Sequence, residues 1–321
     1  MSRIPFAEWA PQRALFVGFP SDPELWEDDL APAQAEVAAM ARQLSETVTV
    51  RLLASGADAA RTARGLVPAA VLVDDIAFGD IWLRDTGPVF TGAGSAVRFR
   101  FNGWGGKYDL PGDDTVGAEM AGLMSAAVEP FDFVLEGGAI EYDGGGLVLT
   151  TEQCLLNPNR NPGWTRAAAE AALGKAIGAR RLVWLGDGLL NDHTDGHVDN
   201  LARFVGEGRL AIPVAAGSDD PNAAIYADAR ARTAAFGGIE IVDLPSPGRV
   251  DVDGELVAAS YMNFYIGNSV VVVPTYGVPN DAAAIDALAA LFPGRRAVGV
   301  PARGIIAGGG SFHCSSQQLP S

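Results

Sequence analysis

The order of the predicted elements indicates an α/β fold, built as one domain from several small modules. Near the N-terminus a strand, a helix and a second strand follow one another, which is the pattern of α/β proteins. Further along, helices recur after roughly regular groups of short strands. None of the proline or glycine clusters is long enough for a linker, so we expect residues 1–321 to form a single domain.

The first 80 residues predict alternating strands and helices. Val37, Met40, Ala41 and Leu44 recur at the spacing of a helix that begins near Asp28. The apolar run RALFVGFP before it ends at a proline, as expected of a buried strand. The expected elements are strands over 13–20, 47–55 and 69–76, and helices over 28–47 and 58–65.

From residue 81 onward the chain predicts short, glycine-rich strands separated by helices. Apolar or alternating runs on both sides of a turn predict hairpins. Hairpins are expected over 133–151, 197–214 and 260–277, further strands over 81–90, 96–106, 180–186 and 239–245, and helices over 115–127, 165–177, 222–236 and 281–292. No strict repeat of the solenoid kind is present.

Composition and charge narrow the class of protein. Hydrophobic residues make up 48% and charged residues 19%, as in ordinary globular enzymes. The formal net charge of −16 argues against a nucleic-acid partner and fits a small cationic substrate better. Two cysteines suit a reducing compartment, and the N-terminus lacks a continuous apolar signal region. We therefore expect a soluble, cytoplasmic protein with no membrane partner, and leave a homo-oligomer open.

The stretch 308–318, GGGSFHCSSQQ, is the strongest candidate for the chemistry. It places Cys314 beside His313, after three glycines that allow backbone to approach a ligand closely. A thiolate is the reactive form of cysteine, so this residue is a candidate nucleophile. The alternative is a buried structural cysteine in a glycine-rich turn.

A second polar stretch, NDHTDGHVDN over 191–200, holds two histidines and several acids. If His197 opens a strand, it shares a face with Asp199 and both side chains meet one ligand. A metal site is an alternative, because His193 and His197 are four residues apart among aspartates. Gly196 and the strand-like continuation argue against the helix that this spacing needs. A solvated acidic turn is a further alternative.

Two more carboxylates stand at the ends of apolar runs. Asp85 lies in IWLRDTGPVF and Glu136 lies in FVLEGGAI. Asp85 and its neighbour Arg84 could form a simple salt bridge. Burial of a carboxylate costs free energy unless it is paired, and a cationic ligand would satisfy both acids.

Eight motifs occur in the order found in agmatine deiminases, and the chain resembles that family from about residue 9 to 318. They are WLRDTGP, FNGWGG, LEGGAI, TTEQCLLNPNRNP, GHVDNLARF, SYMNFYI, VPTYG and GGGSFHC. The family belongs to the guanidine-modifying superfamily, with arginine deiminase and the bacterial peptidyl-arginine deiminases. The resemblance implies a pentein fold, in which five small αβ modules surround a pseudo-fivefold axis and the active site lies in the central channel.

The resemblance also implies roles for five residues. Cys314 resembles the nucleophile that forms an amidino-cysteine intermediate, and His197 resembles the general acid and base. Asp85 and Asp199 look like the carboxylates that hold the guanidinium, and Glu136 looks like the acid that binds it and orients the histidine. Carboxylates match the fork of N–H donors that a guanidinium presents. No metal or organic cofactor is implied.

Two tryptophans and the second cysteine complete the candidates. Trp82 and Trp104 could line the channel and stack on the cation, or belong to the core. Cys154 is interpreted as structural. The family usually has Asn-Ile where Ser311 and Phe312 stand, and commonly Ile-Thr after the cysteine, which bears on the choice of substrate.

Agmatine is the expected substrate, with N-carbamoylputrescine as product. Free arginine would bring a carboxylate that calls for a cation, and Arg84 and Arg303 are available, so arginine and peptidyl-arginine remain alternatives. A protein that only binds polyamines or guanidines is another. Cys314 with His197 or His313 could also serve a cysteine amidase or protease, but the local signatures of papain and the caspases are absent.

Overall fold

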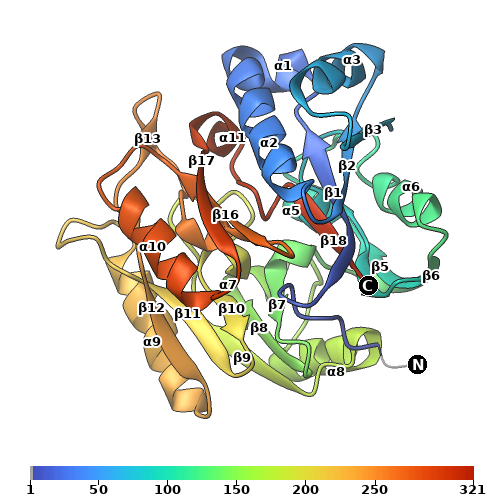
Figure 1. Ribbon diagram of the computed structural model, residues 1–321. Coiled ribbons are helices and arrows are strands. Elements are labelled where there is room, and N and C mark those ends of the chain that lie inside the picture. Colours follow the sequence, from blue (N-terminus) through green and yellow to red (C-terminus); the bar gives the residue numbers. More distant parts are fainter. Residues whose placement is uncertain (1–2) are drawn as a thin grey trace.

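The computed structural model describes residues 3–321 and confirms the α/β class (Figure 1). Five sheets within these residues share one design. In each, an outer strand runs antiparallel to the next strand, and that strand runs parallel to the third. The sheet that holds the N-terminal strand adds a fourth strand, parallel to the third. A helix connects each parallel pair. This is the pentein arrangement that the motifs imply.

The first two modules contain the following elements. Module 1 comprises β1 (Gln12–Phe19), α1 (Pro23–Trp26), η1 (Glu27–Asp29), α2 (Leu30–Leu44), β2 (Thr49–Ala54), α3 (Ala57–Leu66), β3 (Leu72–Asp75), α11 (Arg303–Ala307) and β18 (Ser316–Pro320). Module 2 comprises α4 (Leu83–Thr86), β4 (Val89–Gly92), β5 (Ser95–Arg100), α5 (Gly103–Gly106), α6 (Val116–Leu123) and β6 (Ala127–Val134).

The other three modules follow along the chain. Module 3 comprises η2 (Gly137–Ala139), β7 (Ile140–Tyr142), β8 (Leu147–Thr151), α7 (Glu152–Leu155), α8 (Arg166–Ile177) and β9 (Arg181–Leu185). Module 4 comprises η3 (Val198–Asn200), β10 (Arg203–Gly206), β11 (Arg209–Val214), α9 (Ala223–Phe236) and β12 (Glu240–Pro245). Module 5 comprises β13 (Asp251–Val252), β14 (Glu255–Leu256), η4 (Tyr261–Asn263), β15 (Tyr265–Ile266), β16 (Val270–Thr275), α10 (Asp281–Leu291) and β17 (Arg296–Pro301).

The outer strand of module 1 comes from the opposite end of the chain. β18 pairs antiparallel with β1, with Leu15 opposite Gln318 and Val17 opposite Ser316. Figure 1 shows the red β18 lying against the blue β1. Because β18 begins two residues after Cys314, this pairing fixes the candidate nucleophile against the N-terminal module.

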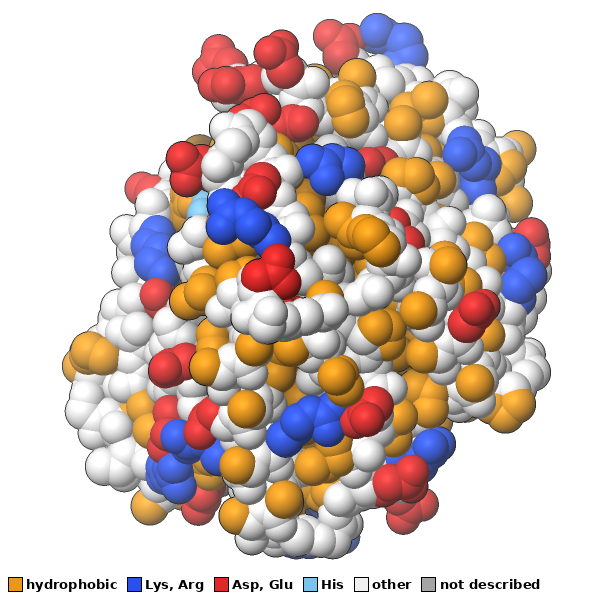
Figure 2. All heavy atoms as spheres, turned by 90° about the vertical axis from the view of Figure 1, so that its left-hand side faces the viewer, with side chains coloured by type: hydrophobic (Ala, Val, Ile, Leu, Met, Phe, Trp, Pro, Cys, Tyr) orange, Lys and Arg blue, Asp and Glu red, His pale blue; other side chains and the backbone are white. Residues whose placement is uncertain are grey.

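The long helices lie at the periphery in Figure 1, and apolar side chains pack between them and their sheets. In module 3, Leu173 and Ile177 of α8 share one buried cluster with Val148 and Leu182 of the sheet. The surface in Figure 2 shows basic side chains scattered among acidic ones, without a basic patch on that face. No helix within residues 3–321 combines the length and the apolar character needed to cross a membrane.

Three expected strands are wrong at the ends nearest the molecular centre. The segment 81–90 begins with the helical turn α4, 96–106 ends in α5, and His197 precedes the 3-10 turn η3 instead of opening a strand. In α4 the carbonyl of Trp82 accepts hydrogen bonds from the backbone N–H groups of Asp85 and Thr86. These local bonds replace the ladder bonds that a strand would make.

The expected hairpin over 133–151 is also too long. Val134 ends β6, and the hairpin proper is β7 with β8. The turn expected at Gly206–Gly208 is confirmed between β10 and β11. The first strand of the hairpin expected over 260–277 is wrong over 260–264, because the 3-10 turn η4 lies there and β15 begins only at Tyr265. The remaining expected helices and strands occur within a few residues of their predicted limits.

Candidate active site

Five short turns, one from each module, meet at the centre of the molecule. Each directly precedes the outer strand of its sheet: α4, η2, η3, η4 and the turn over residues 312–315. Contacts run from α4 to η2, from η2 to η3 and from η3 to η4. Backbone hydrogen bonds close the ring, from His313 to Asn263 (N to O, 3.2 Å) and from Arg84 to Cys314 (3.0 Å). The candidate residues therefore come from different modules but share one centre.

Cys314 lies in the last of these turns and is held by Asn263. The Asn263 side-chain amide donates to Sγ of Cys314 (2.9 Å), and its oxygen accepts from the backbone N–H of Cys314 (3.2 Å). The thiol donates to Oδ2 of Asp199 at 3.5 Å. Burial, together with the charges of Asp199 and Asp85, raises the pKa of the Cys314 thiol well above its ordinary value. The free thiol therefore needs a cation nearby to ionise at neutral pH.

Asp85 and His197 meet beside Gly138. The backbone N–H of Gly138 donates to Oδ1 of Asp85 (2.9 Å), and Trp104 donates from its indole nitrogen to Oδ2 (3.0 Å). Nδ1 of His197 lies 3.6 Å from Oδ1 of Asp85. Burial raises the pKa of Asp85 to about 6, although the charge of His197 opposes the shift. Arg84 does not pair with Asp85, because its guanidinium contacts Glu8 and Gln318.

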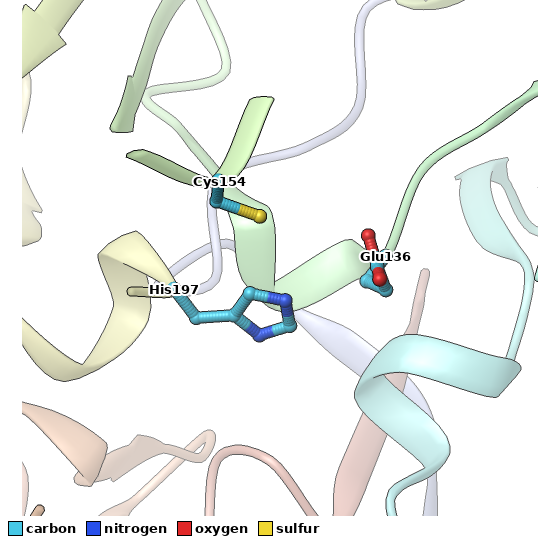
Figure 3. A group of neighbouring side chains, drawn as sticks. All are labelled: Glu136, Cys154 and His197. Atoms are coloured by element: carbon cyan, nitrogen blue, oxygen red, sulfur yellow. The ribbon is translucent and has the colours of Figure 1, made fainter. Parts of the chain in front are cut away.

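Glu136 and Cys154 are both neighbours of the His197 ring. Figure 3 shows the side chains of Cys154 and His197 directed into one space, with Glu136 across it. Ligand atoms of the three lie within 4.8 Å of one another. Arg160 donates to Oε1 of Glu136 (2.7 Å), whereas Oε2 has no hydrogen-bond partner within the described residues. Burial opposes protonation of His197, but the charges of Asp85 and Glu136 and the Cys154 thiol outweigh it and raise its pKa.

Asp199 is held through His313. Nδ1 of His313 lies 2.7 Å from Oδ2 of Asp199, and its Nε2 lies 3.0 Å from Oε2 of Glu8. Burial raises the pKa of Asp199, but the bond and charge of His313 outweigh it, and the net shift is downward. Oδ1 of Asp199 is buried and finds no partner in residues 3–321. This leaves one ionised oxygen free to accept from a ligand.

A cavity of about 210 Å³ leads to Cys314 and Asp85. Trp82 and Trp104 both line it. Asp80 accepts from the indole nitrogens of Trp26 and Trp82 (3.1 and 2.6 Å), which fixes their planes. The lining contains no lysine or arginine from the described part of the chain. The wall is therefore aromatic and acidic, which suits an extended cation.

Four residues that contact the candidate residues were not predicted from the sequence as members of the site: Glu8, Asn263, Arg160 and Cys154. They come from distant parts of the chain. Asn263, Cys154 and Arg160 lie within the family motifs SYMNFYI and TTEQCLLNPNRNP, and this was the one sequence signal that could have identified them. His193, which the metal alternative required, lies at the cavity wall with Nδ1 3.1 Å from the Tyr108 hydroxyl. It is not one of the three residues that gather around His197.

Comparisons with known proteins identify the family of the chain. Residues 4–320 match the model of the Porphyromonas-type peptidyl-arginine deiminase family. An agmatine deiminase of Stutzerimonas stutzeri is 36% identical and covers 98% of this chain and 95% of its own. A solved agmatine deiminase of Enterococcus faecalis is 30% identical, with a TM-score of 0.93 over 99% of this chain and 96% of its own.

A more distant structure matches in fold alone. DDAH from Pseudomonas aeruginosa is 16% identical, with a TM-score of 0.58 over 96% of this chain and all of its own. The five-module architecture thus extends beyond close relatives, whereas the nearer ones match in sequence over nearly the full length. The chain belongs to the Porphyromonas-type peptidyl-arginine deiminase family.

Proposed function

We propose that the protein hydrolyses agmatine to N-carbamoylputrescine and ammonia. The observation that carries the proposal is the pair of buried, unpartnered carboxylate oxygens, Oδ1 of Asp199 and Oε2 of Glu136, around the site of Cys314 and His197. Buried acceptors nearly always have a donor, and a guanidinium supplies several in a plane. The relatives named as agmatine deiminases support the same reaction.

In the proposed mechanism the bound cation activates the nucleophile. Asp85, Asp199 and Glu136 hold the guanidinium, and its charge lowers the pKa of the neighbouring thiol, which releases its proton to solvent. The Cys314 thiolate attacks the central carbon, and imidazolium His197 protonates the departing nitrogen, which leaves as ammonia. An amidino group is then bound to Sγ.

Water completes the reaction. Neutral His197 takes a proton from water as the oxygen bonds to the same carbon. The C–S bond breaks, the thiolate returns, and the remaining hydroxyl proton leaves with ammonia as ammonium. Each assisted proton transfer contributes roughly 10² to 10⁴ in rate. Because every module supplies a turn to this centre, we propose that residues 1–321 act as one catalytic domain.

The cavity favours agmatine over arginine. A free arginine would place its carboxylate among Trp82, Trp26 and acidic side chains, where the lining residues of 3–321 offer no cation. Arg303 binds the carbonyls of Tyr276 and Asp251 instead of lining the cavity. The volume of about 210 Å³ is also below the roughly 300–1,000 Å³ of sites for drug-sized ligands, which suits a small linear substrate.

Ammonia release from agmatine, arginine and a blocked arginine peptide tests the proposal. Agmatine should give the highest kcat/KM, and the peptide should give almost no release. A protein that binds guanidines without releasing ammonia from any of the three would contradict the enzymatic function. A preference for arginine would contradict the assignment of the substrate alone.

A further inference from the structure

The proposed reaction does not use Cys154, yet this thiol lies beside two groups that it does use. Sγ of Cys154, a ring nitrogen of His197 and a carboxylate oxygen of Glu136 lie within 4.8 Å of one another, and all three residues are buried (Figure 3). They come from α7, from the residue before η3 and from the residue before η2. These three segments are separate in the sequence, and only the fold brings their donor atoms together.

The donor atoms of this cluster are free to bind. Neither ring nitrogen of His197 has a partner at hydrogen-bond distance and angle within residues 3–321, although the side chain has no exposed surface and the Cys154 thiol is near enough to influence the pKa of the ring. Oε2 of Glu136 is likewise buried and unpartnered. Buried polar atoms without partners are rare, and here such atoms belong to two of the three residues of the cluster.

The surrounding charges favour a cation at this point. Nδ1 of His197 lies 3.6 Å from Oδ1 of Asp85, and the buried Asp199 approaches the same glycine, Gly138, as His197 does. Arg160 is the opposing charge, but its guanidinium is already shared between Glu136 and Asp195. The net charge of the groups around this point therefore remains negative.

We propose that Glu136, Cys154 and His197 form an inhibitory site for a soft divalent cation, such as Zn²⁺. Sulfur, imidazole nitrogen and one carboxylate oxygen are the donors that such ions prefer, whereas Mg²⁺ and Ca²⁺ prefer oxygen alone. Tetrahedral zinc would need the three atoms roughly 3.5 Å apart, so those of the three distances that approach 4.8 Å must shorten when the metal binds. As the metal binds, the Cys154 thiol proton and a ring proton of imidazolium His197 both leave to solvent, so binding should weaken as the pH falls.

Three protein ligands leave one position for water, which is typical of an exchangeable metal and not of a closed structural site. A metal bound there occupies the imidazole that transfers protons and the carboxylate that holds the guanidinium. Inhibition therefore rests on the proposed function. Binding does not, and it can be measured in a protein that cannot turn over.

Cobalt titration of the Cys314→Ser variant measures binding directly. The chain has two cysteines, so Cys154 is then its sole thiol. Co²⁺ should produce a thiolate-to-cobalt charge-transfer band in the near ultraviolet that saturates at one ion per chain. The matched control adds Cys154→Ser and should lack the band. No band in the single variant, or an equal band in the double variant, overturns the proposal.

Activity measurements supply the second test. Zn²⁺ should inhibit the wild type, a chelator should restore activity, and Mg²⁺ should have no effect. Cys154→Ala, compared with its own metal-free rate, should need at least tenfold more Zn²⁺ for the same inhibition. If Zn²⁺ inhibited the wild type and Cys154→Ala at the same concentration, the inhibiting metal would not be bound by Cys154, which would contradict the proposed metal site. If agmatine is not a substrate, the cobalt experiment still decides the binding.

Discussion

At the scale of single residues, the free site keeps Cys314 neutral until a cation arrives. Burial and the charges of Asp199 and Asp85 both disfavour the thiolate and raise the pKa of the thiol. The substrate brings the opposite charge to the same place. This coupling gives the nucleophile its reactivity only when a guanidinium is present.

Alkylation rates test this coupling. Neutral iodoacetamide should modify Cys314 slowly at pH 8 and faster as the pH rises, because only the thiolate reacts. A cationic haloacetamidine should react faster by at least tenfold, after correction for the reactivity of both reagents toward glutathione. Peptide mapping identifies the modified cysteine. Equal corrected rates would contradict the role of the cation.

Glu8 contacts the ring nitrogen of His313 that does not face Asp199. Its Oε1 lies 3.0 Å from Nη2 of Arg203, and its Oε2 lies 3.0 Å from His313. Burial alone would raise the pKa of Glu8, but the charges of Arg203, His313 and Arg84 outweigh it and lower the pKa far below its ordinary 4.5. The folded state therefore binds fewer protons here than the unfolded state.

Glu8→Gln should lower the free energy of unfolding at pH 7 by about 3 kcal/mol, because the substitution leaves buried cations uncompensated. The contribution of a depressed carboxyl pKa is complete above the unfolded value of 4.5 and is lost as the pH falls below it. The difference between wild type and variant in urea unfolding should shrink below about pH 4.5. A difference that grows there would contradict the assignment.

At the scale of elements, the turns matter more than the strands that follow them. A Cβ on Gly138 of η2 would lie 2.6 Å from Nδ1 of His197, 2.8 Å from Oδ1 of Asp85 and 3.1 Å from Oδ2 of Asp199. The absence of a side chain at this position allows three candidate site residues to converge.

Gly138→Ala should reduce kcat/KM for agmatine by about 100-fold or more, because displacements near 1 Å in a reacting geometry have effects of this size. Gly122→Ala is the matched control. That residue lies in α6 with open space around its Cβ position, and alanine should stabilise the helix by up to about 1 kcal/mol. Activity measurements on both folded variants check the prediction. Full activity of Gly138→Ala would contradict the proposed site.

At the scale of the whole molecule, the pairing of β18 with β1 closes the ring of modules. Leu319 lies opposite Ala14 and is fully buried. Leu319→Ala should lower the free energy of unfolding by about 2–5 kcal/mol. Val214, at 42% exposure on β11, provides the control, and Val214→Ala should stay within about 0.5 kcal/mol. Equal urea midpoints for the two variants would contradict the role of this closure.

The sequence predicted the α/β class and most helices, because periodicity reports which face of an element is buried. It did not predict the five central turns. Asp85 and His197 stand next to apolar runs that are typical of strands. In the structure, backbone hydrogen bonds between residues three or four apart form turns at these places instead. Asn263, Glu8 and Arg160 were missed because their partners lie far away in sequence, and pairing at such distances leaves no local pattern.

The central claim is that Cys314 is the nucleophile, and the Cys314→Ser variant tests it most directly. Two quantities are measured for this variant: ammonia release from agmatine, and agmatine binding by calorimetry. The variant should still bind agmatine, because Asp85, Asp199 and Glu136 remain. Release should fall by at least about 10³-fold, since a removed nucleophile eliminates the covalent route. Release by the variant at a rate near that of the wild type would contradict Cys314 as the nucleophile.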